Sequence, residues 1–244
     1  MDDKNFNYNK DASGIIESAM KQHELNEKSA YCKHNEDKVR KSLNRIDIMV
    51  DLETLGKGDT PPVIQIAAIA FDIKTGATYG RFESFADITS INNIEGDTLS
   101  WWLKTNNELL AKLIEAGKLR GTSEKDCFTQ FCEWIYKVAE SVGLTDEQVF
   151  LWGNGILFDN RIIKNKCRQF GLGYPIFYRN DMDVRTIMEI AAFKMGLSDQ
   201  IEFRNTVEHH GTLHNAMSDV ENQIADVCKA YQVLMSDSVK ANVM

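Results

Sequence analysis

The stretch that decides the fold is IDIMVDLET, residues 46–54, an apolar and β-branched run with two carboxylates near its end. Such a composition is typical of a buried strand. The loop GKGDTPP separates it from a second apolar run at residues 63–71, and a turn at residues 74–76 leads to a third run at residues 78–85. Three strands in a row with short connections predict a β-meander.

The rest of the chain alternates between helical and strand patterns. The predicted elements are helices at residues 97–116 and 124–142, a strand at 149–152, a helix at 157–170, a weak strand at 176–178, and helices at 184–195 and 215–234. Strands followed by alternating helices and strands favour a mixed β-sheet covered by helices on both faces. The expected fold class is therefore α/β.

The first 45 residues differ in composition from the rest of the chain. They hold nine Lys or Arg, eight Asp or Glu, no proline, and one apolar cluster at helical spacing around residues 15–20. We expect residues 1–45 to form a polar, partly helical extension. A length of 244 residues leaves residues 46–244 as one sizeable domain.

Composition and charge exclude several classes of protein. The net charge is −8, and residues 46–244 alone hold 19 basic against 28 acidic residues; since domains that coat nucleic acid are usually basic, any nucleic-acid contact must be local. No apolar run approaches the roughly 18 residues of a membrane span, and the polar start MDDKNFNYNK is unlike a secretory signal. Five cysteines without a C-x-x-C pair argue against a disulfide framework. We expect a cytoplasmic protein with reduced thiols and no membrane partner.

The first residues that carry chemistry are Asp51 and Glu53. Because side chains alternate along a strand, both project to one face while Leu52 points to the other. Two neighbouring carboxylates repel each other, and a divalent cation removes that repulsion with the hard oxygen ligands it prefers. Taken alone, the pair is weak evidence, because D-x-E at the end of a strand is more often a solvated turn.

Further carboxylates occur later in the chain. Asp159 follows the predicted strand and a Gly-containing turn in WGNGILFDN, where a helix N-terminus would also favour an acidic residue. His214 and Asp219 lie five residues apart, which places them about 140° apart on an ideal helix. They can act together only if His214 lies on the loop or first turn that leads into the last helix; the alternative is a capping histidine and a surface aspartate.

Together these motifs resemble those of a known group of enzymes. D-x-E on the first strand, Asp159 after a strand and turn, and H-x-A-x-x-D from His214 to Asp219 are similar to the three motifs of the DnaQ-like, DEDDh-type 3′-5′ exonucleases. The segment DTLSWW at residues 97–102 and DVRT at residues 183–186 resemble the branch that contains T-even phage exonuclease A and small exoribonucleases. The resemblance covers about residues 46–235 and implies a ribonuclease-H-like fold.

The resemblance also implies a mechanism. Two divalent metals, Mg²⁺ or Mn²⁺, would lie about 3.5–4 Å apart, held by Asp51, Glu53, Asp159 and Asp219. Asp51 would bridge both metals, Glu53 and Asp219 would complete the site that holds the nucleophilic water, and Asp159 would support the second metal. His214 is the candidate general base, because imidazoles exchange a proton near pH 6.5, roughly the working range of enzymes.

Three further groups of residues allow other interpretations. The triplet His209, His210 and His214 contains an i, i+4 spacing found in zinc sites, yet Gly211 interrupts the helix that this spacing would need, so we expect His209 and His210 in a loop. Asp183 precedes a helix and is expected to be its N-cap.

Trp101 and Trp102 point about 100° apart on a helix, so one is expected in the core and the other could stack on a terminal base. The expected substrate-binding residues are Thr54, Leu55, Gly56, Trp101, Trp102 and Asn154.

The function that these residues imply is hydrolysis of single-stranded DNA or RNA from the 3′ end to nucleoside 5′-monophosphates, with two metals per active site. The alternative is a non-catalytic nucleic-acid-binding or proofreading-accessory module of the same fold, which the intact set of acidic residues disfavours. The choice between DNA and RNA depends on contacts to the 2′-OH, which no motif here reports. The sequence does not decide whether the chain forms a homodimer or binds an accessory partner.

Overall fold

The computed structural model describes residues 43–211 and 214–236. The predicted extension, residues 1–45, therefore lies almost entirely outside the described residues. The strands are β1 (Ile46–Thr54), β2 (Val63–Phe71), β3 (Thr78–Phe85), β4 (Val149–Gly153) and β5 (Asp181–Asp183). The α-helices are α2 (Gly96–Thr105), α3 (Asn107–Arg120), α4 (Glu124–Ser141), α5 (Asp159–Phe170), α6 (Val184–Met195), α7 (Gln200–Arg204) and α8 (Ala216–Met235), with short 3₁₀ turns at Ile88–Ser90 and Asp146–Gln148. Among the described residues, no helix has the length and apolar character that crossing a membrane requires.

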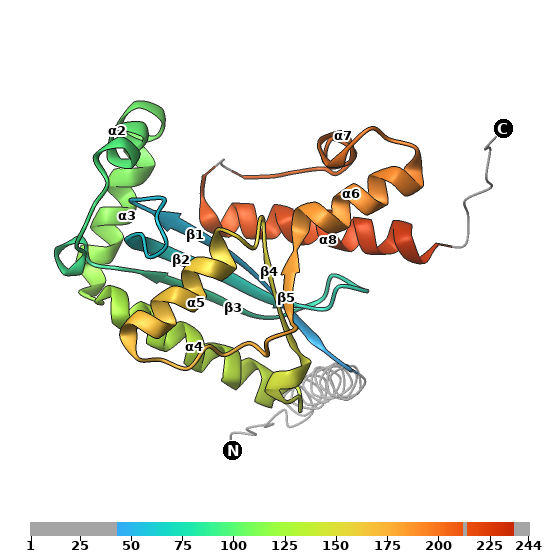
Figure 1. Ribbon diagram of the computed structural model, residues 1–244, viewed down its shortest axis with the longest axis horizontal. Coiled ribbons are helices and arrows are strands. Elements are labelled where there is room, and N and C mark those ends of the chain that lie inside the picture. Colours follow the sequence, from blue (N-terminus) through green and yellow to red (C-terminus); the bar gives the residue numbers. More distant parts are fainter. Residues whose placement is uncertain (1–42, 212–213, 237–244) are drawn as a thin grey trace, which may run out of the picture. The chain divides into compact units, whose positions relative to one another are not determined.

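The sheet is mixed, with the strand order β3-β2-β1-β4-β5 (Figure 1). β1, β2 and β3 form the predicted antiparallel meander, and β4 and β5 run parallel to β1. The register pairs Asp51 with Ala67 and Glu53 with Gln65, and a bulge follows Glu53. The carboxyl ends of β1, β4 and β5 therefore meet at one edge of the sheet, as the carboxyl ends of parallel strands do. The predicted α/β fold class is confirmed.

Helices cover both faces of the sheet (Figure 1). α8 packs on β1 and β2 and against α6, where Met49 of β1 shares a buried cluster with Val220 and Val227 of α8. α4 and α5 contact the sheet from the other side. A buried ion pair joins these two helices, with Lys166 Nζ 2.6 Å from Glu124 Oε1. Because side chains alternate along β1, Asp51 and Glu53 lie on the face of Met49, toward α8.

One predicted helix is two helices in the structure. The helix expected at residues 97–116 breaks at Asn106, whose backbone has φ −154° and ψ 53° and belongs to neither α2 nor α3. Asn106 ends α2 by donating its backbone N–H to Trp102 O. Asparagine favours such positions because its side chain competes with helical hydrogen bonds. The break gives α2, which carries both tryptophans, a direction different from that of α3 (Figure 1).

The prediction of a weak strand at residues 176–178 is wrong. The strand that pairs with β4 is β5, which aligns Leu151 with Asp181. Asn180 fixes this register, because its side-chain amide donates to Val149 O at 2.9 Å and its carbonyl accepts from Leu151 N at 3.0 Å. Ile176 is buried, yet outside the ladder. Apolar composition thus marked a core contact rather than a strand.

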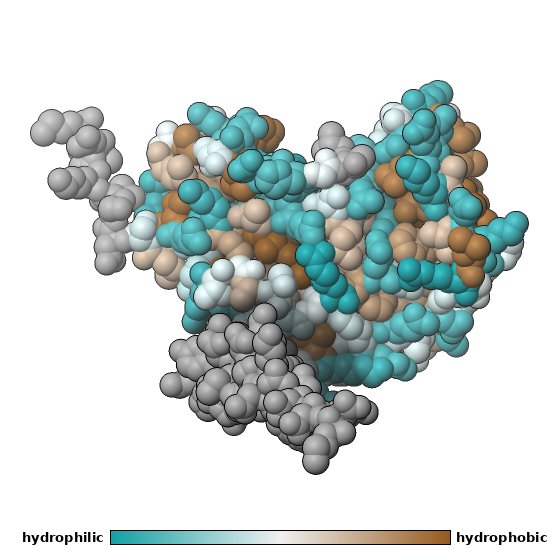
Figure 2. Space-filling model, turned by 180° about the vertical axis from the view of Figure 1, so that it is seen from behind, coloured by the Kyte–Doolittle hydropathy of each residue, from teal (hydrophilic) through white to brown (hydrophobic). Residues whose placement is uncertain are grey.

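The face opposite to that of Figure 1 is covered mainly by hydrophilic residues (Figure 2). Hydrophobic residues interrupt it in several separate groups. Scattered apolar groups of this kind are ordinary on a protein surface and carry no functional conclusion.

Candidate active site

Three carboxylates meet where β1 ends under the first turn of α8. Oxygen atoms of Asp51, Glu53 and Asp219 all lie within 4.8 Å of one another. β1 presents the first two on one face, and α8 supplies the third from its N-terminal turn. Asn215 fixes the start of that turn as N-cap, because its side chain accepts a hydrogen bond from Ser218 N at 3.1 Å. The structure therefore brings together the two outer motifs predicted from the sequence.

Asp159 approaches the same place from α5. It is buried, and its Oδ1 accepts a hydrogen bond from the backbone N–H of Leu52 at 3.3 Å, between the two carboxylates of β1. Gly153 makes this approach possible, since a Cβ there would stand 2.3 Å from Asn160 Oδ1 and 3.2 Å from Asp159 Cβ. The glycine at the end of β4 is thus a packing requirement of the second motif.

Burial raises the pKa of every carboxyl in this group, and repulsion between carboxylates adds to the rise at Asp51 and Glu53. Burial, with the negative charges of Asp159 and Asp219, raises the pKa of Asp51 well above its usual range. Burial and the same kind of repulsion raise the pKa of Glu53 to about 9. Burial raises the pKa of Asp159 to about 7, although backbone hydrogen bonds oppose the shift, and burial also raises the pKa of Asp219. Four desolvated carboxyls that repel one another form a set that divalent cations would neutralise.

A glutamine that the sequence reasoning missed lies beside this group. Gln223 is buried on α8, and its Nε2 donates to Asp51 Oδ1 at 3.0 Å. Its Oε1 has no hydrogen-bond partner among the described residues. The sequence does carry a signal, because Gln223 follows Asp219 by four residues and so shares its helix face.

His214 lies on the loop that leads into α8, as the sequence predicted, one residue before the N-cap. Its backbone is left-handed, with φ 62°, a conformation in which histidine is enriched among non-glycine residues. Burial raises the pKa of Asp219, and the imidazole and the backbone N–H of His214 both oppose that rise. The imidazole meets the ring of Trp101 edge to face, with centroids 5.2 Å apart.

His209 and His210 lie in the loop before His214, as predicted, and have partners of their own. His209 Nε2 is 2.8 Å from Asp226 Oδ1, and the backbone of His210 exchanges two hydrogen bonds of 2.9 Å with the side chain of Asn222. Among the described residues, the group that could hold a metal contains carboxylates and no histidine. These contacts anchor the loop to α8 instead of building a zinc site.

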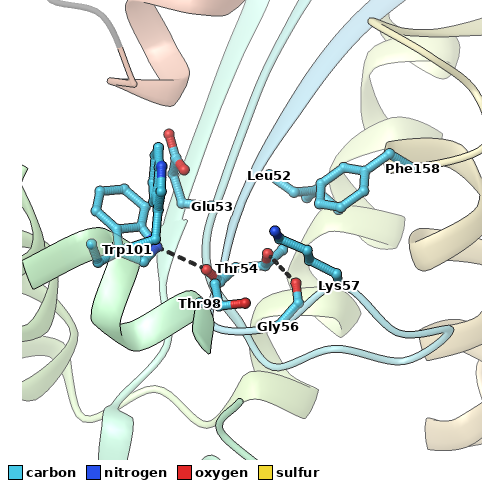
Figure 3. Close-up of a pocket in the computed structure, with 9 residues that line it drawn as sticks. Leu52, Glu53, Thr54, Gly56, Lys57, Thr98, Trp101 and Phe158 are labelled. Atoms are coloured by element: carbon cyan, nitrogen blue, oxygen red, sulfur yellow. Dashed lines mark hydrogen bonds between the residues drawn. The ribbon is translucent and has the colours of Figure 1, made fainter. Parts of the chain in front are cut away.

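A pocket of about 450 Å³ opens beside the carboxylates (Figure 3). It is lined by Leu52, Glu53, Thr54, Gly56, Lys57, Thr98, Trp101, Trp102 and Phe158. Figure 3 shows that Glu53 borders the pocket next to Trp101 of α2, while Phe158 and Leu52 stand on the opposite side. The pocket thus joins a carboxylate to aromatic walls, an arrangement suited to a nucleotide.

Four of the six predicted substrate-binding residues line the pocket, namely Thr54, Gly56, Trp101 and Trp102, whereas Leu55 and Asn154 do not. Trp101 is 41% exposed, whereas Trp102 is 2% exposed and donates its Nε1–H to Thr54 O, so one tryptophan is core, as expected. Leu55 is fully buried, and the structure does not bring its side chain to the pocket. Asn154 lies outside the pocket, on the turn after β4, where its Oδ1 accepts a hydrogen bond from Arg185 Nε at 3.2 Å.

Comparison with protein families gives a match over most of the chain. The family described as the 3′-5′ exoribonuclease Rv2179c-like domain matches residues 46–231. Comparison with curated protein sequences gives no match.

Solved structures of nucleases share the fold. Cell-death related nuclease 4 (CRN-4) superposes with a TM-score of 0.57 at 16% identity, covering 77% of this chain and 64% of its own. The nuclease domain of 3′hExo, a DEDDh family member bound to rAMP, gives 0.51 at 14% identity, covering 78% of this chain and 94% of its own. E. coli Exonuclease I in complex with a dT13 oligonucleotide gives 0.55 at 15% identity, covering 76% and 40%. The chain thus spans less than two thirds of CRN-4 and of Exonuclease I.

Proposed function

This chain belongs to the family of 3′-5′ exoribonuclease Rv2179c-like domains, and on that premise we propose that it is a divalent-metal-dependent 3′-5′ exonuclease of single-stranded RNA or DNA. The observation that carries the proposal is the group of Asp51, Glu53 and Asp219, with ligand atoms within 4.8 Å of one another, and with buried Asp159 beside them. The family description and the rAMP bound to 3′hExo support RNA, while the dT13 bound to Exonuclease I supports DNA as a second substrate.

The residues present fit a pair of hard divalent cations. All proposed ligands are carboxylate oxygens, which suit Mg²⁺ or Mn²⁺ better than zinc. Asp51, Glu53, Asp159 and Asp219 would hold the cations. When bound, the cations would supply charge neutralisation at the entering and leaving oxygens of the phosphodiester.

The protein's own groups bind the end of the strand and move the proton. The pocket between Trp101 and Phe158 would hold the last nucleotide, with its 5′ phosphate toward Glu53. A water attacks phosphorus and gives its proton to His214, the P–O3′ bond to the preceding nucleotide breaks, and the leaving O3′ takes a proton from solvent. The products are a nucleoside 5′-monophosphate and a strand shortened by one residue with a free 3′-OH.

The hydrolysis test uses the purified chain and 5′-labelled RNA and DNA oligonucleotides. We expect a ladder that shortens from a free 3′ end with Mg²⁺ or Mn²⁺, no reaction with a chelator, and no reaction when the 3′ end is blocked. Binding without hydrolysis under all of these conditions would instead support the accessory-module alternative.

The role of His214 is tested separately. His214→Ala should lower the rate by about 10²- to 10⁴-fold, with metal affinity nearly unchanged, because the imidazole transfers a proton and is not a ligand. It should also remove the rise of rate with pH in the range where imidazoles titrate, around pH 6.5. His210→Ala is the matched control and should keep that rise. If the pH profile is flat in His210→Ala and unchanged in His214→Ala, the base is not His214.

A further inference from the structure

Arg185 stands at the rim of the carboxylate group on an element that none of the three motifs uses. It is the second residue of α6 and is exposed. Its Nε donates to Asn154 Oδ1 at 3.2 Å. Its guanidinium lies over Gly155, where a Cβ would stand 3.4 Å from Cζ, 3.5 Å from Nη1 and 3.7 Å from Nη2. These contacts place the head group beside the turn that leads to Asp159.

Among the described residues, no carboxylate forms an ion pair with Arg185. Four other arginines of the described chain pair with carboxylates, in the pairs Arg45–Asp47, Arg81–Glu221, Arg161–Asp59 and Arg204–Asp226. Within residues 43–211 and 214–236, no carboxylate oxygen lies within 4.0 Å of the Arg185 guanidinium, although its charge acts on Asp159. Its two Nη groups are oriented and available to an anionic ligand.

The order of the strands indicates which part of a substrate reaches this guanidinium. The pocket for the last nucleotide lies between the end of β1 and α2, and the carboxylates lie on β1. β4 and then β5 follow β1 in the sheet on the side away from β2 and β3. The turn with Asn154 follows β4, and α6 with Arg185 follows β5. A strand that fills the pocket and crosses the carboxylates would pass next over Asn154 and Arg185.

We propose that Arg185 binds the phosphate immediately 5′ to the phosphodiester that is cut. A guanidinium offers two parallel N–H donors to a phosphate, and the hydrogen bond to Asn154 orients them. Residues 46–244 are acidic overall and therefore repel an anionic substrate. The positive charge of Arg185 would offset this repulsion locally. The inference rests on the proposed exonuclease function.

The test compares substrates that differ by one charge. A dinucleotide has only the phosphate that is cut, a trinucleotide has one more on its 5′ side, and a trinucleotide with a methylphosphonate there has the length without the charge. Arg185→Gln should lower kcat/KM for the trinucleotide by about 10- to 100-fold, the size expected for a charged hydrogen bond. It should leave the dinucleotide and the methylphosphonate within about twofold, since neither offers the charged partner. Arg185→Lys should lose less.

A second test of the inference needs only the wild-type protein. It should cut the methylphosphonate trinucleotide as slowly as Arg185→Gln cuts the normal one. Arg179→Gln, an exposed arginine stacked on Tyr178, is the matched control and should leave all three rates unchanged. An equal loss in Arg185→Gln on all three substrates, or no loss, overturns this inference while the exonuclease function stands. A wild-type protein that cuts none of them contradicts the function itself, and the inference with it.

Discussion

At the scale of single residues, the carboxyls of the site store repulsion that the fold does not relieve. Glu53 is 8% exposed and has Asp51, Asp159 and Asp219 as negative neighbours. Its pKa of about 9, against an ordinary 4.5, means that the folded protein without metal holds a proton there that the unfolded chain releases. The free energy of unfolding must therefore depend on pH through this residue.

The sign of that dependence follows from proton counts. Between about pH 4.5 and pH 9 the folded state binds more protons at Glu53 than the unfolded state does, so the free energy of unfolding decreases as pH rises through this window. Asp159, with a pKa of about 7, acts in the same direction at the lower end. With a chelator present, Tm should fall from pH 5 to pH 8. Mg²⁺ should reduce the fall.

Glu53→Gln should make the metal-free Tm at pH 8 equal to or higher than that of the wild type, because folding of the wild type at this pH must take up a proton at Glu53, and Gln removes that cost. Its pH dependence should be flatter. Glu133→Gln, on the exposed side of α4, is the control and should follow the wild type. A metal-free Tm that rises steadily with pH, in wild type and Glu53→Gln alike, would contradict the picture of repelling carboxyls.

Gln223 supports Asp51 from behind, and its removal should weaken the proposed metal site. Gln223→Leu keeps a side chain of similar size between α8 and the sheet but removes the donor to Asp51 Oδ1. Metal affinity should fall by about 10- to 100-fold, as for other groups that orient metal ligands. Calorimetric titration with Mn²⁺ measures it directly. Unchanged affinity in a folded Gln223→Leu protein would show that Asp51 needs no support from α8.

At the scale of elements, α3 is seated directly on the backbone that follows β3. A Cβ at Gly117 would stand 2.2 Å from the carbonyl oxygen of Ala86, so only glycine permits this contact. α3 is joined to α2, the helix of Trp101 and Trp102, through Asn106 alone. The position of one pocket wall therefore depends on a contact at the far end of α3.

Gly117→Ala should destabilise the protein by about 1–3 kcal/mol, the usual cost of overpacking, because the obstacle is backbone and cannot rotate away. Gly96→Ala is the matched control, since a Cβ there meets nothing within 4 Å at the first position of α2. It should change stability by less than about 0.5 kcal/mol. Urea unfolding of both variants separates the two effects; equal stability would mean that α3 can shift without cost.

Local patterns predicted the elements better than the contacts between them. The alternation along β1 placed Asp51 and Glu53 on one face, and the angle between His214 and Asp219 predicted a histidine outside α8. The short strand β5 escaped notice because its pairing with β4 is a tertiary contact, and the break at Asn106 was missed although asparagine is a poor helix former. Gln223 was missed, and Arg185 was noted only as part of the segment DVRT, because each gains its role from a partner far away in the chain, 31 residues for Arg185 and 172 residues for Gln223.

At the scale of the whole molecule, an acidic chain is proposed to degrade an acidic polymer. Residues 46–244 carry nine more acidic than basic residues. Bulk attraction cannot then hold the substrate, and binding must depend on a few local groups, namely the cations at the carboxylates, the aromatic pocket and Arg185. Such binding is weak and sensitive to salt. The proposed function therefore depends above all on the carboxylate group.

The most direct test measures nucleoside 5′-monophosphate released from a single-stranded RNA oligonucleotide in Mg²⁺ by wild-type protein and by Asp219→Asn, side by side. Asn keeps the shape of the side chain but removes the charge that α8 contributes to the group. The account predicts stepwise release from the 3′ end by the wild type, and a loss of at least about 10²-fold in the folded variant. Release by Asp219→Asn within tenfold of the wild-type rate, or the same release by wild type in a chelator, would contradict it.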